Sequence, residues 1–134
     1  MRKTWREKMN PGAKMKLIRL EKKYMGAEPG AKMLVATPEI VRDYISSIPR
    51  GQTRTASQIR ADLARSHKAQ ITCPTSTGIF VRIAAEAALE ELNEGKSIKK
   101  ITPFWRAVDP DSPAAQKLTC GPDFVRARRK EEDK

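Results

Sequence analysis

The sequence has few of the residues that build catalytic and metal sites. Among 134 residues it has two cysteines, Cys73 and Cys120, and one histidine, His67. A structural zinc site built on these three would need a carboxylate as its fourth ligand, which is unusual. No G-x-x-x-x-G-K-[ST] or G-x-G-x-x-G stretch is present, which argues against an enzyme that holds a nucleotide in a phosphate-binding loop. We therefore expect a non-enzymatic protein with no catalytic residue, no metal and no cofactor.

Long apolar runs are also absent. No stretch approaches the ~20 apolar residues of a membrane span. The first residues, MRKTWREKMNPG, contain no apolar segment like that of a signal peptide. We expect a cytoplasmic, nucleoid-associated protein without a membrane partner, in which both cysteines are reduced.

Positive charge dominates the composition. The chain has 27 Lys and Arg against 16 Asp and Glu, a formal net charge of +11. Such an excess indicates a polyanionic partner, most commonly nucleic acid, although a protein can be basic without one. Because only two Trp, two Tyr and three Phe are present, few rings are free to stack on single strands. Double-stranded DNA is the expected partner, and an RNA- or protein-interaction module is the alternative.

Residues 1–36 are predicted to form a basic, partly ordered N-terminal arm. Ten of the first 32 residues are Lys or Arg. Turn signals at Asn10-Pro11-Gly12 and Pro29-Gly30 bracket KMKLIRLEKKYMG, which fits neither the helical nor the strand period cleanly. We expect a short strand followed by a helical turn there, and a second strand over KMLVA, residues 32–36.

Two helices are predicted to follow the arm. Thr37 is a good N-cap and Pro38 suits the first helical position, so a helix begins there and ends before Pro49. Its apolar stripe is Ile40, Val41, Tyr44, Ile45 and Ile48. Thr55 and Gln58 have the spacing of a capping box that starts a second helix. Its inward residues are predicted to be Ala56, Ile59 and Leu63. A short extended piece is expected at Ile71-Thr72.

The longest predicted helix covers residues 75–95 and is a candidate recognition helix. Apolar residues recur at helical spacing, namely at Ile79, Phe80, Ile83, Ala84, Ala87, Ala88 and Leu92. The cluster Thr75, Ser76 and Thr77 is expected to cap it, and Gly95 to end it. The opposite stripe, predicted to face solvent, is Arg82, Glu86, Glu90 and Asn93. On this stripe Arg82 comes first and the two glutamates follow it, so only the N-terminal end of the helix is suited to face a polyanion.

The order of elements predicts the fold class. A helix, a tight basic loop, a second helix and a longer helix outline a helix-turn-helix relative. KSIKK (96–100) and ITPFWRAV (101–108) are β-prone and predict a wing of two short strands. A short helix from Pro113 to Leu118, capped by Ser112, is expected next. We predict an α+β, mainly α, winged helix-turn-helix-like domain over residues 37–125, followed by a charged tail over residues 126–134.

Three stretches resemble the DNA-binding domain of the O6-alkylguanine-DNA alkyltransferases and alkyltransferase-like proteins. Ile48-Pro49-Arg50-Gly51, leading through Thr55 to Gln58-Ile59, is similar to the family's I-P-x-G…T-x-x-Q-I entry. Residues 81–87, VRIAAEA, are similar to the recognition helix that begins R-A-V-G-x-A. Residues 103–108, PFWRAV, stand where the family has P-C-H-R-V. The resemblance covers residues 37–125 and implies a protein that senses alkylated or damaged bases, with DNA-repair proteins as further partners.

The departures from that family exclude alkyl transfer. Phe104 stands in place of the methyl-accepting cysteine and Trp105 in place of the activating histidine. A phenyl ring has no thiolate with which to attack an alkyl group. Ala56 replaces the family's tyrosine beside the turned-out nucleotide, whereas Arg82 matches the arginine that fills the gap left by a flipped base.

Two groups of site residues follow. The predicted DNA contacts are Arg50, Arg54, Thr55, Ser57, Arg60, Thr75, Ser76, Thr77 and Arg82. The predicted base pocket is formed by Pro103, Phe104 and Trp105, the last two on opposite faces of a strand. Arg82 could instead pair with Glu86 one turn on. A thiol enzyme using Cys73 with His67 is a further alternative, since Cys73 precedes a helix N-terminus that would stabilise a thiolate.

Overall fold

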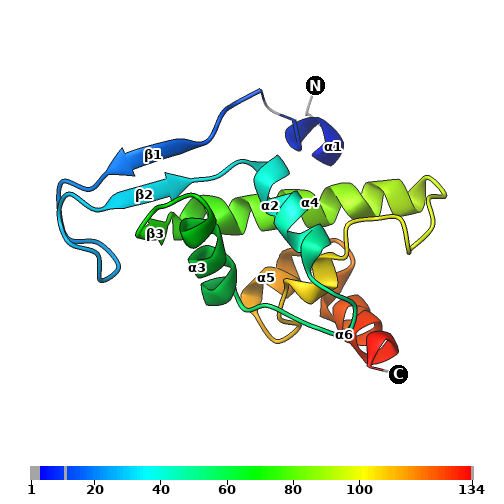
Figure 1. Ribbon diagram of the computed structural model, residues 1–134. Helices are drawn as coiled ribbons and strands as arrows, with labels where there is room; N and C mark the ends of the chain where they lie inside the picture. The colour runs from blue at the N-terminus through cyan, green and yellow to red at the C-terminus, as the bar shows by residue number, and fades with distance from the viewer. Residues whose placement is uncertain (1–3, 11, 134) are drawn as a thin grey trace.

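The computed structural model describes residues 4–10 and 12–133 (Figure 1). The elements in chain order are α1 (Trp5–Lys8), β1 (Lys16–Arg19), β2 (Lys32–Val35), α2 (Pro38–Ser47), α3 (Ala56–Ser66), β3 (Ile71–Thr72), α4 (Pro74–Asn93), the 3-10 turn η1 (Phe104–Arg106), α5 (Pro113–Lys117) and α6 (Gly121–Glu132). Helices with one small sheet agree with the predicted α+β class. None of the described helices is long and apolar enough to cross a membrane.

The sheet joins the N-terminal arm to the start of α4. Its strand order is β1-β2-β3, with β1 antiparallel and β3 parallel to β2. The Cys73 N–H continues the ladder by donating to the Leu34 carbonyl at 2.8 Å. All three predicted strands before α4 are therefore confirmed. The helical turn predicted after β1 is wrong, because Met25, Gly26 and Gly30 have positive φ angles, which a right-handed helix cannot contain.

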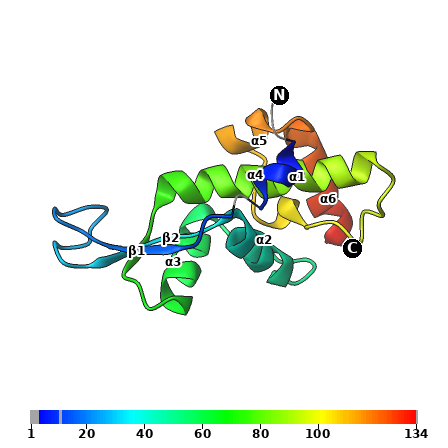
Figure 2. The same cartoon turned by 90° about the horizontal axis from the view of Figure 1, so that it is seen from above.

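Helix α4 is central and has a hydrophobic core on each of two sides (Figure 2). Ala84 and Ala87 face the core that includes Leu34, Val41 and Ile45. Ala85, Ala88 and Leu89 face the core that includes Phe104, Trp105 and Val125. The run of alanines lets elements on both sides approach the helix closely. The buried apolar stripe predicted for α2 is confirmed, since Val41, Ile45 and Ile48 are buried.

The second core interrupts the predicted solvent stripe of α4 at Glu86, whereas Arg82 and Asn93 are exposed as predicted. Glu86 is only 1% exposed, and its carboxylate accepts hydrogen bonds from the Thr119 N–H at 3.2 Å and hydroxyl at 2.6 Å. Elements α5 and α6 cover this face of α4, which no local period could reveal. Two residues predicted to point inward, Ile79 and Ala56, are exposed.

Helix starts follow the predicted rules in three cases out of four. The Ser112 hydroxyl caps α5 as predicted, by accepting a hydrogen bond from the Ala115 N–H. Thr37 caps α2, and Thr55 and Gln58 cap α3 through reciprocal hydrogen bonds of 3.1 and 2.8 Å. Helix α4 begins one residue earlier than predicted, with Cys73 as its N-cap and no side-chain cap. Its Thr75, Ser76 and Thr77 therefore lie inside the first turn, because Pro74 fits the first helical position.

The wing predicted after Gly95 is wrong. Residues 96–108 contain turns and the 3-10 turn η1 but no strand. Ile101, Phe104 and Trp105 bury their side chains in the core beside α4, and Pro103 has no N–H to donate to a ladder. The boundary predicted between residues 125 and 126 falls inside α6, a packed helix whose Arg129 donates to the carbonyls of Trp105 and Val108.

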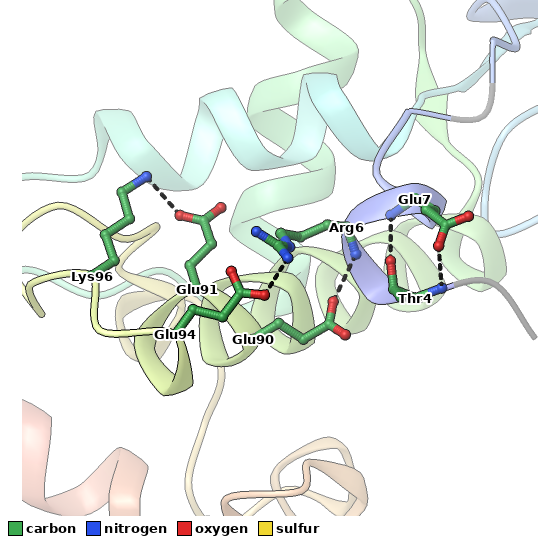
Figure 3. Close-up of polar contacts among 7 residues, drawn as sticks. All are labelled: Thr4, Arg6, Glu7, Glu90, Glu91, Glu94 and Lys96. Carbon is green, nitrogen blue, oxygen red and sulfur yellow. Dashed lines mark hydrogen bonds and ion pairs between the residues drawn. The ribbon is translucent and has the colours of Figure 1, made fainter.

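The N-terminal arm is held at both ends of α4. At the C-terminal end, the Arg6 N–H donates to Glu90 at 2.9 Å, and the Arg6 guanidinium pairs with Glu94 (Figure 3). Thr4 and Glu7 form the capping box that starts α1. The other attachment is the β2–β3 pairing near the α4 N-terminus. Residues 12–31 span the distance between these two anchors.

Candidate nucleic-acid interface

A hollow of about 400 Å³, the interhelix groove, lies where α3 and α4 begin. Four of the predicted DNA-contact residues line it: Arg54, Thr55, Arg60 and Thr77. Residues from the first turns of both helices form its walls, including Ala56 and Gly78. The first-turn N–H groups of a helix lack intrahelical partners and carry the positive end of the helix dipole. Two such ends at one groove make it a surface suited to anions.

Two hydrogen bonds fix the loop and the connection around this groove. The Thr72 hydroxyl donates to the Arg60 carbonyl at 2.7 Å, which joins β3 to α3. The Arg54 N–H donates to the Arg106 carbonyl at 2.8 Å, which joins the basic loop to η1. The Thr55–Gln58 capping box then sets the direction in which α3 leaves the loop. The short sheet and η1 therefore determine how the two helix starts meet.

The groove cations keep their charge available. The Arg54 guanidinium donates to the Thr53 carbonyl and to the Gln52 side chain, at 3.0 and 3.1 Å. Arg60 lies 3.5 Å from the hydroxyl of Ser57, which is exposed. These partners are neutral, and no ion pair joins either arginine to a carboxylate among the described residues. Arg54 also interacts with Tyr44, whose hydroxyl donates to Asp62. The groove also contains Asp109, which makes its charge mixed rather than uniformly positive.

A second hollow of about 300 Å³ extends the groove along α4. Gly78 and Val81 line both hollows, and the predicted contacts Thr75 and Arg82 line the second. Arg82 is exposed, with its guanidinium carbon 5.3 Å from the centre of the Trp5 ring. The alternative pairing of Arg82 with Glu86 is wrong, because Glu86 is buried against Thr119.

Ser76 and Thr77 turn toward Cys73. The Thr77 hydroxyl is buried and donates to the Cys73 carbonyl at 2.7 Å. Burial tends to raise the pKa of the Cys73 thiol, but the nearby Ser76 hydroxyl and the N–H groups of Ser76 and Thr75 lower it overall. His67 gives this thiol no base, since its Nδ1 lies 2.9 Å from the Leu63 carbonyl and no hydrogen bond joins it to Cys73 in the part of the chain described.

The predicted base pocket is divided by the fold. Pro103 and Trp105 line a separate cavity of about 960 Å³ that shares no lining residue with the interhelix groove. Phe104 is fully buried and does not line this cavity. Its ring meets Trp105 edge to face and stacks on Phe124, with centroids 5.4 and 5.8 Å apart. The prediction of opposite faces of a strand is wrong, because η1 turns both rings into one core.

Arg50 belongs to this cavity and not to the groove of Arg54 and Arg60. Lys99, Lys100 and Arg128 also line it, although none was predicted as a site residue. The basic run KSIKK was a visible signal for the two lysines, but it was interpreted as part of a wing. Nothing local in the sequence places Arg128 there, since α6 reaches the cavity through tertiary packing alone.

Comparisons with family models, with curated proteins and with solved structures find no match to this chain. Among the described residues, no group of three or more His, Cys, Asp and Glu side chains could hold a metal ion.

Proposed function

We propose that the protein binds double-stranded DNA without catalysing a reaction, with α3 and α4 acting as a helix-turn-helix pair. The observation that carries the proposal is the meeting of two helix N-termini with Arg54 and Arg60 at one groove. Phosphate oxygens accept hydrogen bonds from helix N-termini and from arginine, and such contacts fix the position of a protein on a duplex. The net charge of +11 supports long-range attraction to the same partner.

In this proposal Arg54, Arg60 and the first turn of α3 contact phosphates. The exposed start of α4, with Thr75 and Arg82, then lies along the duplex. Arg82 has no carboxylate partner among the described residues and lies on the Trp5 ring, so its guanidinium is available to reach a base step. The acidic C-terminal half of α4 is partly neutralised, because Glu90 and Glu94 bind Arg6.

The finer part of the proposal is recognition of an alkylated or damaged base, in keeping with the resemblance to alkyltransferase-like proteins. Alkyl transfer is excluded from it because Phe104 has no thiolate and is fully buried. A base turned out of the duplex would enter the interhelix groove, where Ala56 leaves room. The proposal predicts tighter binding to a duplex with O6-alkylguanine than to the unmodified duplex. Equal affinities would leave a general DNA-binding protein.

The test is a fluorescence-anisotropy titration of duplex DNA over a range of salt concentrations. Each lost phosphate contact should make the slope of log K against log salt shallower by about 0.9. Since that slope spans one decade between 1 M and ~0.1 M salt, the variant should bind about 8-fold more weakly at ~0.1 M salt, if the affinities at 1 M are equal. We expect this loss for Arg54→Gln and for Arg60→Gln. Arg65→Gln is the matched control, since Arg65 lies on the same helix and pairs with Asp62. If the protein does not bind duplex DNA at low salt, or if its binding does not depend on salt, the proposal is refuted. If structured RNA competes better than duplex DNA, the alternative of an RNA-interaction module is supported.

A further inference from the structure

Exposed apolar side chains gather on one projecting segment, residues 12–32, which we call the hairpin arm. Among the described residues, the large hydrophobic side chains that are exposed are Met15, Leu17, Ile18, Tyr24 and Met25 on the arm, and Ile79 near the start of α4. All four residues of β1 are exposed on both faces of the ribbon. Several exposed apolar side chains on one segment of a small protein point to an interaction surface.

Most of the basic side chains of the arm form no ion pair among the described residues. Its basic residues are Lys14, Lys16, Arg19, Lys22, Lys23 and Lys32, against Glu21 and Glu28. The only ion pair of the arm among the described residues joins Lys23 to Glu28 at 3.7 Å, with both side chains well exposed. In β1 cations and apolar residues share each face, with Lys16 and Ile18 on one and Leu17 and Arg19 on the other. This pattern fits a polyanion that also offers apolar surface.

The arm begins beside the proposed DNA-contacting end of α4. β2 pairs with β3, and the Cys73 N–H bonds the Leu34 carbonyl, so the root of the arm is fixed to the N-cap of α4. Figures 1 and 2 both show the arm extending beyond the end of the molecule at which α4 starts. Tyr24 at the tip lies five positions beyond Arg19, a reach of at most about 17 Å at ~3.3 Å per residue.

We propose that the hairpin arm enters the major groove of the DNA duplex that the interhelix groove binds. This inference rests on the proposed function and adds a second, separate contact. The major groove is wide enough for a two-stranded β-ribbon. Because β1 is exposed on both of its faces, it can direct lysines to the phosphates on either wall, while Leu17, Ile18 and the tip residues Tyr24 and Met25 contact thymine methyl groups and the groove floor.

A second copy of the chain is the main competing occupant, because β1 is an edge strand. Edge strands pair with other chains unless charges oppose it. Two β1 strands would bring Lys16 and Arg19 of each copy close to those of the other, and like charges in facing strands destabilise pairing. The negative charge of a duplex removes this repulsion, so DNA fits the arm better than a second copy does.

The experiment compares the wild-type protein with two arm variants on one duplex, by salt titration and by methylation protection. Dimethyl sulfate methylates guanine N7 in the major groove and adenine N3 in the minor groove. Lys16→Gln with Lys22→Gln should lower the salt slope by about 1.8 and the affinity about 60-fold at ~0.1 M salt, for two phosphate contacts. Tyr24→Ser with Met25→Ser should weaken binding without changing the slope. Both should lose protection of guanine N7 at one block of positions.

Lys99→Gln with Lys100→Gln is the matched control, since it removes two cations beyond the opposite end of α4 and should leave that block protected. Wild-type binding that no arm variant alters, or arm-dependent protection at adenine N3 only, overturns the inference and leaves the proposed function standing. Absence of DNA binding by the wild type overturns both. A wild-type dimer that Ile18→Lys converts to a monomer in sedimentation velocity, without change in DNA affinity, assigns the arm to a second copy. If Lys16→Gln with Lys22→Gln weakens binding to anionic vesicles as much as binding to DNA, the arm selects negative charge alone, and the inference of a major-groove contact is overturned.

Discussion

Replacement of Arg106 should destabilise the protein more than any single change at its surface. The Arg106 guanidinium donates to both carboxylate oxygens of Glu132, at 2.9 and 2.8 Å, and to the Ile48 carbonyl at 2.7 Å. The two side chains are only 15% and 4% exposed. Arg106 thus holds together the end of α2, the turn η1 and the end of α6. We choose Arg106→Met, which keeps much of the volume and removes the charge.

The expected cost follows from what the substitution leaves behind. The Glu132 carboxylate would remain buried without a cation, and the Ile48 carbonyl would lose its donor. Breaking a buried ion pair by removing one partner costs about 3–5 kcal/mol. Since a domain is stable by about 5–15 kcal/mol, this is a large share of the free energy of unfolding. With a urea m-value of ~2 kcal/mol/M, the unfolding midpoint should fall by about 2 M.

The assay is urea unfolding of four proteins followed by circular dichroism: wild type, Arg106→Met, Glu132→Leu and the double variant. Replacing both partners by apolar residues of similar size is often close to neutral. The double variant should therefore be more stable than Arg106→Met, and the cycle should show coupling of several kcal/mol. If the two single costs simply add, the pair does not act as a unit and the reasoning is refuted.

The same pair predicts a pH dependence. Burial tends to raise the pKa of Glu132, but the hydrogen bonds and charge of Arg106, the nearby Trp105 indole and the Gly51 N–H lower it to about 2, from an ordinary value of 4.5. A carboxyl group with a lowered pKa stabilises the fold fully above the ordinary value and loses this contribution as pH falls toward 2. Wild-type stability should decline from about pH 4.5 to 2. The Arg106→Met variant should lack this decline. In that variant, protonation of Glu132 at low pH should remove the cost of its buried, unpaired charge.

Two further predictions concern the start of α3 and the two thiols. Thr55→Ala removes the cap that accepts the Gln58 N–H and should lower the free energy of unfolding by about 1 kcal/mol; Thr55→Ser should restore it, and an unchanged urea midpoint for Thr55→Ala would contradict the assigned cap. Cys73 should react with iodoacetamide faster than Cys120 near neutral pH, because hydrogen bonds from Ser76 help lower the pKa of Cys73, while burial and the charge of Glu86 raise that of Cys120. Peptide mass spectrometry measures both rates, and equal rates would contradict this assignment of the thiol environments.

The local chemistry of the sequence was enough to predict most helix starts and all the strands before α4. Thr37-Pro38 and the Thr55–Gln58 box are confirmed as predicted, because a cap involves only residues a few positions apart. The strand at residues 32–35 is similarly visible as a short apolar run after a turn signal, whereas residues 16–19 fit neither period cleanly and are expected as a strand with less support. The groove was predictable in part, since Arg54, Thr55 and Arg60 adjoin a helix start that the sequence marks.

Tertiary packing decided what lies against α4 and therefore which polar residues face solvent. Glu86 has the spacing of a surface residue but is buried, because Thr119 and the α5–α6 layer arrive from far along the chain. The β-prone residues 96–108 form η1 because burial of Phe104 and Trp105 in the second core replaces strand pairing. In the same way, Arg50 is separated from Arg54, and Arg128 is brought beside Trp105. Periodicity describes one element at a time, whereas these outcomes depend on which elements meet.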